Sequence, residues 1–325
     1  MKVKSCFIVI LLVVFSLAVC AQAAFAEDKY PSKPIRIIIT HKAGGSTDRP
    51  ARLVAPYMEK NLGVNLVIEN MVGAGGSIAR KYVYSQKPDG YTLLFSQHPS
   101  LTISSITTGA YDPLSYVPIY GISGGNYQGI GVPYDSPYKD LRDLIKASQK
   151  ERITICGAGI GAQSFLATIL LNKKGGANFT YIPFNSTPQA LLGVASGSVD
   201  SICSTYSQFG PMEKKKKIRL ITTLGPKRAE FAPNIPTGLE LGVPVQLDQM
   251  GGFFGPPGLS DDKRAILAAA IDKAVKDPEF LANAKKVNEG LGLLGPEEFE
   301  KAVTDLHNVT MEAAPYIKEA IKKKK

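Results

Sequence analysis

The chain has 325 residues and a formal net charge of +10. This length exceeds what one hydrophobic core usually organises, so two domains are expected. The basic residues do not alternate with aromatic ones and no nucleic-acid-binding module is recognisable, which excludes a DNA- or RNA-binding protein. The charge is concentrated in two runs of four lysines, at 214–217 and 322–325, which are typical of solvated ends of elements. The three histidines (His41, His98 and His307) lie far apart and no C-x-x-C motif occurs, so neither a metal site nor a cofactor is expected.

The N-terminus has the pattern of a cleavable secretory leader. Lys2 and Lys4 precede an apolar run at residues 6–19, and Ala24-Phe25-Ala26 supplies an A-x-A cleavage site. The run is shorter than the roughly 20 residues of a spanning helix, which argues against a membrane anchor. We therefore expect residues 1–26 to be a signal peptide and the mature protein, with 36 basic and 28 acidic residues, to be periplasmic.

The first half of the mature chain alternates strands, glycine-rich loops and helices. Residues 35–39 are short and β-branched, as in a buried strand, and the glycine loop that follows precedes helical spacing of apolar residues at 50–62. Such an order predicts a parallel sheet covered by helices. Further strands are expected at 64–69 and 91–95, and a helix at 78–85.

The same order restarts at residue 153. Strands are expected at 153–156, 179–183, 199–203 and 218–223, and helices at 163–172, 188–195, 261–282 and 296–321. The stretches 116–133 and 245–257 are rich in Gly, Pro and aromatic residues and are interpreted as crossings between two units. The prediction is an α/β fold with a discontinuous first lobe (27–124 plus 250–325), a second lobe (125–249), and a cleft suited to hinge closure.

Two glycine-rich loops follow predicted strands and begin predicted helices. The loop at 157–162 fits the dinucleotide pattern G-x-G-x-x-(G/A), but the next strand ends in Pro183-Phe184-Asn185-Ser186 without the required acid. The loop at 43–48 is its counterpart in the first unit. Glycines expose backbone N–H groups, and a helix N-terminus favours an anion. One such loop from each lobe predicts a carboxylate site in the cleft.

Catalytic motifs are weak in this sequence. Residues 121–125 match G-x-S-x-G, but 126–133 is predicted as strand or loop where that motif needs a helix. The dispersed histidines allow no Ser-His-acid constellation, and the acid pairs 261–262 and 297–298 suit helix starts. We predict a protein that is not an enzyme; an exported hydrolase or isomerase acting on a small acid, or a receptor for a neutral ligand, remain the alternatives.

Short segments in a specific order and spacing point to a family. They are Tyr30-Pro31-Ser32-Lys33-Pro34-Ile35-Arg36, Gly44-Gly45-Ser46-Thr47-Asp48, Glu69-Asn70 with Gly73-Ala74-Gly75-Gly76-Ser77, residues 88–94, the loop at 157–161, residues 190–192 with 197–200, and residues 255–258. The mature chain thereby resembles the Bug receptors, the extracytoplasmic solute-binding proteins of tripartite tricarboxylate transporters. The resemblance implies a type II periplasmic-binding-protein (Venus-flytrap) fold and a di- or tricarboxylate or aromatic carboxylate ligand. It also implies a membrane permease as partner, or a sensing role without one, and we expect a monomer.

The resemblance also implies which residues bind the ligand. Backbone amides of both loops hold one carboxylate in this family, which by position are those of Ala43, Gly44, Gly45 and Ser46 and of Gly159, Ile160, Gly161, Ala162, Gln163 and Ser164. Asp48 is expected to brace the first loop.

The chain departs from the family pattern where ligand choice would be expressed. Most members have an aromatic residue and prolines where His41, Lys42 and Ala43 stand, and Ser-Ser-His where Ala162, Gln163 and Ser164 stand. We expect Lys42 to add a cation and His98 a donor; a solvent-facing Lys42 and a buried, backbone-bonded His98 are the alternatives. Gln97, Asn185 and Ser204, at strand ends, complete the candidates, and Cys156 and Cys203 are expected to be separate buried thiols.

Overall fold

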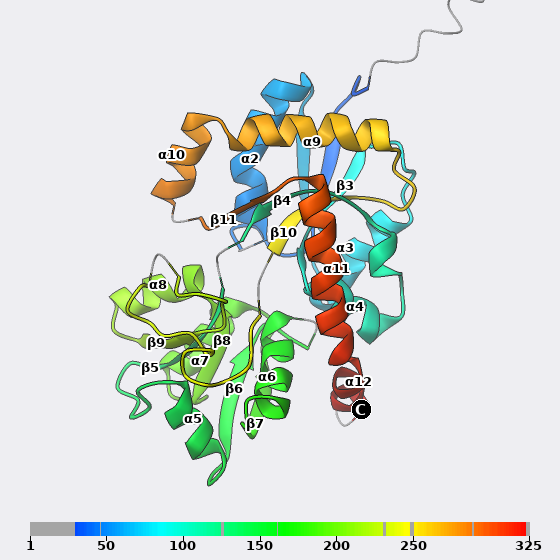
Figure 1. Cartoon of the computed structure of the whole chain (residues 1–325). Coiled ribbons are helices and arrows are strands. Elements are labelled where there is room, and N and C mark those ends of the chain that lie inside the picture. Colours follow the sequence, from blue (N-terminus) through cyan, green and yellow to red (C-terminus); the bar gives the residue numbers. More distant parts are fainter. Residues whose placement is uncertain are drawn as a thin grey trace, which may run out of the picture.

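The computed structural model describes residues 30–45, 47–124, 127–160, 162–229, 232–247, 250–287 and 289–322. Its strands form two separate sheets, which Figure 1 shows in the upper and lower halves of the molecule, each with its own helices. The expected signal peptide lies outside the described residues, and so do Ser46 and Gly161.

The first sheet has six strands in the order β11-β4-β10-β3-β1-β2. Strand β1 is buried on both faces: Ile37 and Ile39 pack into one core and Ile38 into another. An apolar run without alternation is what such a strand requires. The strands are β1 (Ile35–Ile39), β2 (Leu66–Asn70), β3 (Thr92–His98), β4 (Val117–Ser123), β10 (Met250–Gly255) and β11 (Leu291–Leu294).

Helices cover both faces of this sheet. On one face α2 packs against α9, and their apolar sides enclose a core with β1 and β3. On the other face Leu101, Phe299 and Val303 close a second core over Ile38 and Leu94. The helices are α2 (Asp48–Leu62), α3 (Ser77–Tyr84), α4 (Ser100–Thr108), α9 (Asp261–Val275), α10 (Pro278–Lys286) and α11 (Pro296–Glu312), with short 3-10 turns at Ala74–Gly76 and Pro113–Ser115.

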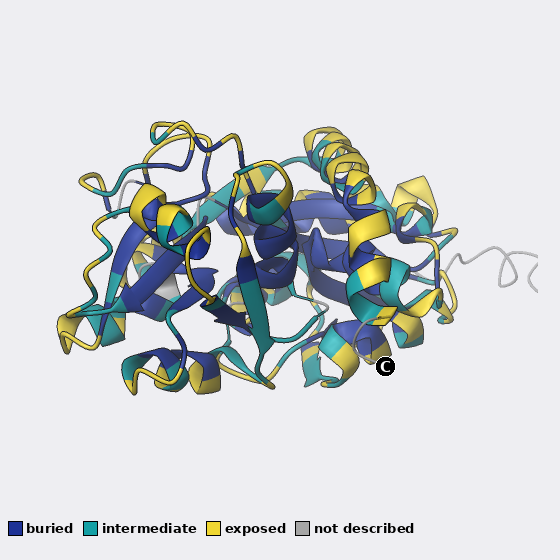
Figure 2. Cartoon of the chain, turned by 90° about the horizontal axis from the view of Figure 1, so that it is seen from below, coloured by how far each residue is buried: buried dark blue, intermediate teal, exposed yellow. Residues whose placement is uncertain are grey.

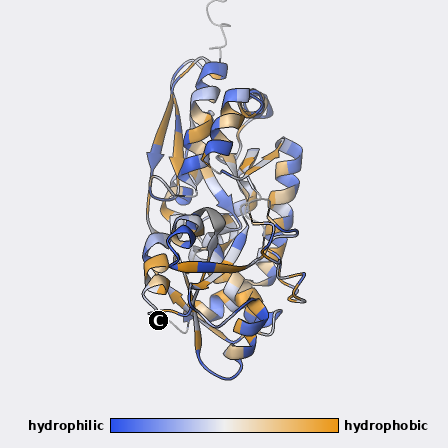
Figure 3. Ribbon diagram, turned by 90° about the vertical axis from the view of Figure 1, so that its left-hand side faces the viewer, coloured by the Kyte–Doolittle hydropathy of each residue, from blue (hydrophilic) through white to orange (hydrophobic). Residues whose placement is uncertain are grey.

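The second sheet has five strands in the order β7-β6-β8-β5-β9. Its faces are likewise covered by helices, α5 and α6 over one core and α7 and α8 over the other. Figure 2 shows central strands that are buried and helices that are exposed on their outer sides, while the edge strand β7 is mostly half-buried. Figure 3 shows helices that carry both hydrophobic and hydrophilic residues. The elements are β5 (Gln128–Pro133), β6 (Ile153–Gly157), β7 (Phe179–Pro183), β8 (Ser201–Thr205), β9 (Ile218–Thr223), α5 (Leu141–Ser148), α6 (Gln163–Lys173), α7 (Thr187–Ala195) and α8 (Tyr206–Lys214).

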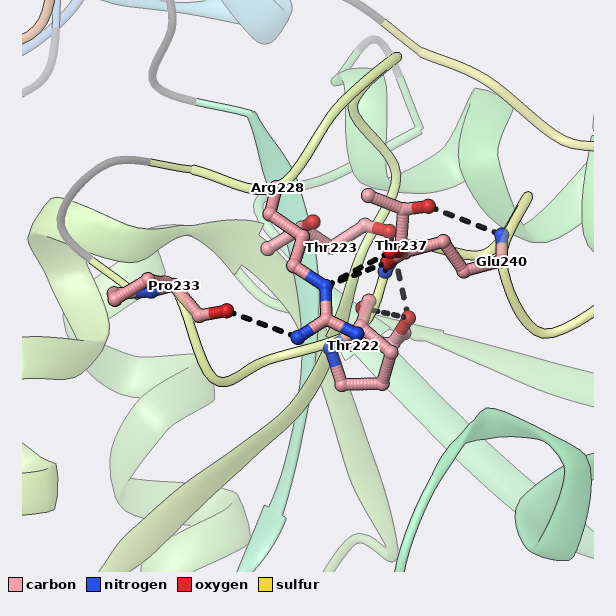
Figure 4. A network of polar contacts seen from close by, with 7 residues as sticks. Thr222, Thr223, Arg228, Pro233, Thr237 and Glu240 are labelled. Carbon is pink, nitrogen blue, oxygen red and sulfur yellow. Dashed lines mark hydrogen bonds and ion pairs between the residues drawn. The ribbon is translucent and has the colours of Figure 1, made fainter.

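The long segment after β9 is held to the second sheet by a polar network (Figure 4). The guanidinium of Arg228 is bonded to the Glu240 carboxylate at 2.9 Å and donates to the carbonyl of Pro233 at 3.0 Å. Glu240 in turn accepts from the backbone N–H of Thr237, while its own N–H donates to the Thr237 hydroxyl. Backbone groups that have no strand partner are satisfied in this way.

The structure corrects several predicted elements. Helices α4, α5 and α8 and strand β11 were not predicted, because their apolar residues are few or interrupted. The expected helix at 261–282 is two helices, since Asp277 accepts from Glu279 N and Pro278 begins a new helix. The expected helix at 296–321 is also divided, near Ala313. The stretches interpreted as crossings contain strands β4, β5 and β10, whose antiparallel pairing makes both sheets mixed.

The last helix contacts both units. Helix α12 (Ala314–Lys322) packs against α4 and α6, and Ala313 and Ile317 belong to the same core as Ile103 and the apolar residues of α6. In Figure 1 it lies beside α6 at the lower end of α11. The C-terminal segment assigned to the first lobe therefore also packs on the second sheet.

Candidate functional site

The site lies where one edge of each sheet meets the other. Strands β1 and β3 are parallel, so both end at the same edge, and the antiparallel β10 begins there. The Gln163 Nε2 atom, at the start of α6, donates to the His98 carbonyl, at the end of β3, over 2.8 Å. Both glycine loops follow strands at these edges, which is where ligands bind in open α/β sheets.

The first glycine loop is fixed by Asp48. Gly44 adopts φ +78°, a conformation that favours glycine, and its N–H donates to Asp48 Oδ2 at 2.8 Å. Arg52 Nε and Asn70 Nδ2 donate to the same carboxylate. Burial alone would raise the pKa of Asp48, but the hydrogen bonds from Arg52, Asn70 and Gly44 outweigh it and lower the pKa. The side chain is 1% exposed, so the charged carboxylate is held inside the loop rather than offered to solvent.

Lys42, Ala43 and Gly44 are exposed and Gly45 is half-buried. His41 is half-buried, and its Nδ1 atom lies 2.8 Å from Thr40 Oγ1 and 3.3 Å from Thr47 Oγ1. Desolvation and, to a smaller extent, the charge of Arg80 lower the pKa of His41 to about 4. The imidazole at the start of this loop is therefore neutral at physiological pH.

The second glycine loop leads into a helix without a capping side chain. Gly159 has φ +85°, and its carbonyl accepts from the Tyr181 hydroxyl, which also bonds Ser164 Oγ at 2.8 Å. The N-cap residue of α6 is Ala162, and no acidic residue occurs in the first turn. The positive end of α6 is therefore not neutralised by a protein carboxylate in its own first turn. Ile160 and Ala162 are half-buried, whereas Ser164 is buried.

Gln163 joins the two sheets. It is 4% exposed, and besides its bond to His98 its Oε1 accepts from Gln128 Nε2 at 2.8 Å. Both ends of this amide are used within the protein. A ligand contact through the Gln163 side chain would require one of these bonds to open.

His98 is fully buried. Its Nε2 lies 3.2 Å from Thr102 Oγ1, which is also 3.0 Å from His307 Nδ1. Burial, with smaller contributions from His307 and Arg80, lowers the pKa of His98 to about 3. Within the described part of the chain its Nδ1 has no hydrogen-bond partner. The alternative of a buried, backbone-bonded histidine is therefore confirmed in its burial but not in its bonding, because the ring bonds the Thr102 hydroxyl.

The remaining candidates lie at strand ends. Gln97 is buried on β3. Asn185 is exposed just after β7, and Ser204 is buried on β8, opposite Gly129 of β5. Cys156 and Cys203 are free, buried thiols, as expected. Cys156 is aligned with Ile202 in the β6–β8 pair, so Cys203 points to the opposite face of the sheet, and burial raises the pKa of both thiols.

Two arginines near this edge were missed by sequence reasoning. Arg49 follows the first loop, and its Nη2 lies 3.4 Å from Oε2 of Glu289, which is buried just before β11. Burial raises the pKa of Glu289, and Arg49 opposes that shift. Arg80 of α3 is fully buried. No local pattern signals either residue, because their partners come from distant segments of the chain.

The described residues contain no cluster of His, Cys, Asp or Glu that could hold a metal ion. No helix in the described ranges is long and apolar enough to cross a bilayer. A surface pocket of about 420 Å³ is lined by Tyr30, Asn61, Ile266 and Lys273, at the opposite edge of the first sheet from the glycine loops.

The chain forms two mixed sheets, each flanked by helices, and crossing segments join them. Each sheet has a glycine loop at the edge that faces the other sheet. This arrangement defines a two-lobed solute-binding protein. Residues 50–294 match the family described as "Tripartite tricarboxylate transporter family receptor". A protein of Cupriavidus necator, described as "UPF0065 protein in gbd 5'region", is 32% identical over 277 residues, which cover 83% of this chain and 84% of that protein. The chain belongs to the tripartite tricarboxylate transporter receptor family, and the predicted relation to the Bug receptors is confirmed.

Solved structures agree with this assignment. The periplasmic binding protein BugD superposes with a TM-score of 0.74 at 27% identity, covering 90% of this chain and 98% of that one. MatC of Rhodopseudomonas palustris, solved with bound malate, gives a TM-score of 0.76 at 25% identity, covering 88% of this chain and all of that one. The predicted two-lobed α/β fold is confirmed.

Proposed function

We propose that this protein is a periplasmic receptor that captures a small organic carboxylate between its lobes, without covalent chemistry. It would deliver the ligand to the membrane permease of a tripartite tricarboxylate transporter, or report it to a sensor. The observation that carries the proposal is the uncapped start of α6, which the Gln163–His98 bond brings to the edge where the first glycine loop begins.

Backbone N–H groups at a helix start suit a carboxylate because they combine directed donors with the positive end of the helix dipole. The first loop adds exposed backbone at Ala43 and Gly44, whose conformation Asp48 fixes before any ligand arrives. A preorganised loop loses less entropy when it binds. The malate in MatC supports a carboxylic acid as the ligand class.

The side chains at this edge favour a receptor over an exported enzyme. General acid–base catalysis needs a group whose pKa lies near the working pH and which reaches the substrate. His41 and His98 are neutral with strongly lowered pKa values, and Asp48 is held by three donors with its pKa lowered. Burial raises the pKa of Glu289, but its carboxylate lies against Arg49.

The test is a thermal-shift screen of the mature protein against di- and tricarboxylates and aromatic acids, each paired with its neutral amide. A ligand that binds only the native state stabilises it by about 2.7 kcal/mol at 100 times its Kd. We expect at least one acid to raise the melting temperature while its amide does not. A protein that no acid stabilises, or that amides stabilise equally, would contradict the proposal.

A further inference from the structure

Arg80 is a buried cation with few partners. Its side chain, on α3, is fully buried. Nε donates to Ser96 Oγ at 3.1 Å and Nη1 donates to the Gly75 carbonyl at 3.0 Å. Nη2 has no hydrogen-bond partner among the described residues. A guanidinium has five N–H donors, so much of this one is unsatisfied.

Among the described residues no carboxylate compensates the charge of Arg80, which forms no ion pair there. Its polar surroundings include Tyr111 and Tyr116, the latter donating to the Arg80 carbonyl. Burial lowers the pKa of Arg80, yet an arginine side chain stays protonated in proteins. An uncompensated buried charge is costly for folding, so its presence calls for a role beyond stability.

The guanidinium lies beside Gly76, close to Thr40, the residue that connects β1 to the first glycine loop. A Cβ added to Gly76 would lie 2.9 Å from Thr40 Cβ and 3.1 Å from both Nη1 and Nη2 of Arg80. Thr40 follows β1 and leads into the loop. Ser96, which holds Nε, and His98 lie two residues apart on β3 and so point to the same face of the sheet. The charge therefore sits between the ends of β1 and β3, at the edge where the two sheets meet.

We infer that Arg80 is the fixed positive charge that makes this site select anionic over neutral ligands, acting through its field across Thr40 and Gly76 rather than by contact. The inference rests on the proposed function and names the residue behind the ligand's required charge. A charge in a low-dielectric interior acts strongly over several ångströms, whereas exposed Lys42 is screened by water and salt. Arg80 is accordingly a positioning residue for the ligand, and Lys42 is not needed for this selection.

The other charges around the first loop have partners of their own or are exposed. Arg49, which follows the loop, lies 3.4 Å from the Glu289 carboxylate. Asp48 is bonded to Arg52, Asn70 and Gly44, so its negative charge is offset within the loop. Lys42 is exposed. His41 reports the local potential, because Arg80 is the charged group that, after desolvation, lowers its pKa.

The test separates charge from hydrogen bonding. Arg80→Gln keeps a side-chain donor for Ser96 or Gly75 but removes the charge, and Arg80→Lys keeps the charge but removes the planar fork. Lys150→Gln, at an exposed position beyond α5, is the matched loss of one charge far from the site. Circular dichroism checks that each variant folds.

Calorimetry measures the affinity for malate, succinate and adipate, each compared with its diamide. We expect the affinity for the acids to fall about tenfold in Arg80→Gln, to stay close to wild type in Arg80→Lys and to be unchanged in Lys150→Gln. Diamide affinity should not change.

A ligand-free readout accompanies this. In NMR titrations, with the three histidines assigned by substitution, the His41 pKa should rise in Arg80→Gln and stay near the wild-type value in Arg80→Lys. If an acid binds wild type and Arg80→Gln equally, or the His41 pKa does not move, the inference is overturned while the proposed function stands. If no acid binds the wild-type protein, the proposed function fails and the role in ligand selection fails with it, even where the His41 pKa moves. Equal losses in both Arg80 variants would assign hydrogen bonding instead of charge.

Discussion

Individual side chains at the glycine loops are committed to contacts inside the protein. Asp48 is the clearest case, because one buried carboxylate accepts hydrogen bonds from a loop amide, a guanidinium and a side-chain amide. The binding atoms this leaves to a ligand are those of the backbone.

Asp48→Asn should show the cost of removing that carboxylate. The substitution keeps the shape but leaves Arg52 and the loop amide with a neutral and partly mismatched partner, so we expect a loss of about 2–4 kcal/mol in the free energy of unfolding. Urea denaturation measures it, with Asp140→Asn, a helix N-cap at the surface, as a control that loses about 1 kcal/mol or less. Equal losses in the two variants would argue against the brace.

The lowered pKa values of His41 and His98 make stability depend on pH. Folding lowers the pKa of His41 from 6.5 to about 4 and that of His98 to about 3, so between these values and 6.5 the unfolded chain binds more protons. Stability is therefore fully present above pH 6.5 and falls as the pH drops below it, by about 1.4 kcal/mol per pH unit for each histidine. Folding raises the pKa of Glu289, so its effect is opposite: above its unfolded pKa, the contribution of this carboxyl group to stability falls as the pH rises.

Urea denaturation at pH 7.5, 6 and 5 should therefore show a loss of about 4 kcal/mol between the first and the last, because both histidines contribute below pH 6.5. His98→Gln should show a shallower slope, because one of the two histidines no longer titrates. A free energy of unfolding that stays flat down to pH 5 would contradict the neutral state of both rings.

At the scale of elements, α6 and β3 are tied by one amide. Gln163→Ala would leave the His98 carbonyl and the Gln128 amide each without this partner, at a cost of about 1–3 kcal/mol. Thermal unfolding should register it, whereas Gln149→Ala at the exposed end of α5 should change stability by less than about 1 kcal/mol. If both variants melt alike, the tie contributes nothing to how the sheets meet.

For the whole molecule, the C-terminal helix is the element that spans both units. Ile317 is fully buried against a core shared by α4 and α6, so Ile317→Ala should lower the free energy of unfolding by about 2–5 kcal/mol. Lys318→Ala, on the exposed side of the same helix, should stay within about 0.5 kcal/mol of wild type. A small loss in Ile317→Ala would mean that α12 is not needed to hold the units together.

Sequence reasoning located β1, β7 and β9 with the bounds that the structure shows. In β1 the reason is that isoleucines buried on both faces form an almost continuous apolar run. It missed α4 and α8, whose polar and interrupted sequences, Ser100–Thr108 and Tyr206–Lys214, become helical through tertiary packing. It also missed that the expected helices at 261–282 and 296–321 are each divided into two, because helix caps and prolines set those boundaries.

The sequence by itself determined the family, the two α/β units and the glycine loops, because these depend on local patterns of glycine, apolar runs and spacing. The tertiary structure alone decided which side chains the site can use. It buried His98, left Lys42 in solvent and occupied both ends of Gln163. It also buried Arg80 beside Gly76, with no ion-pair partner among the described residues. The reason is physical: burial and the pairing of charges depend on residues that are distant in sequence, and no local pattern records them.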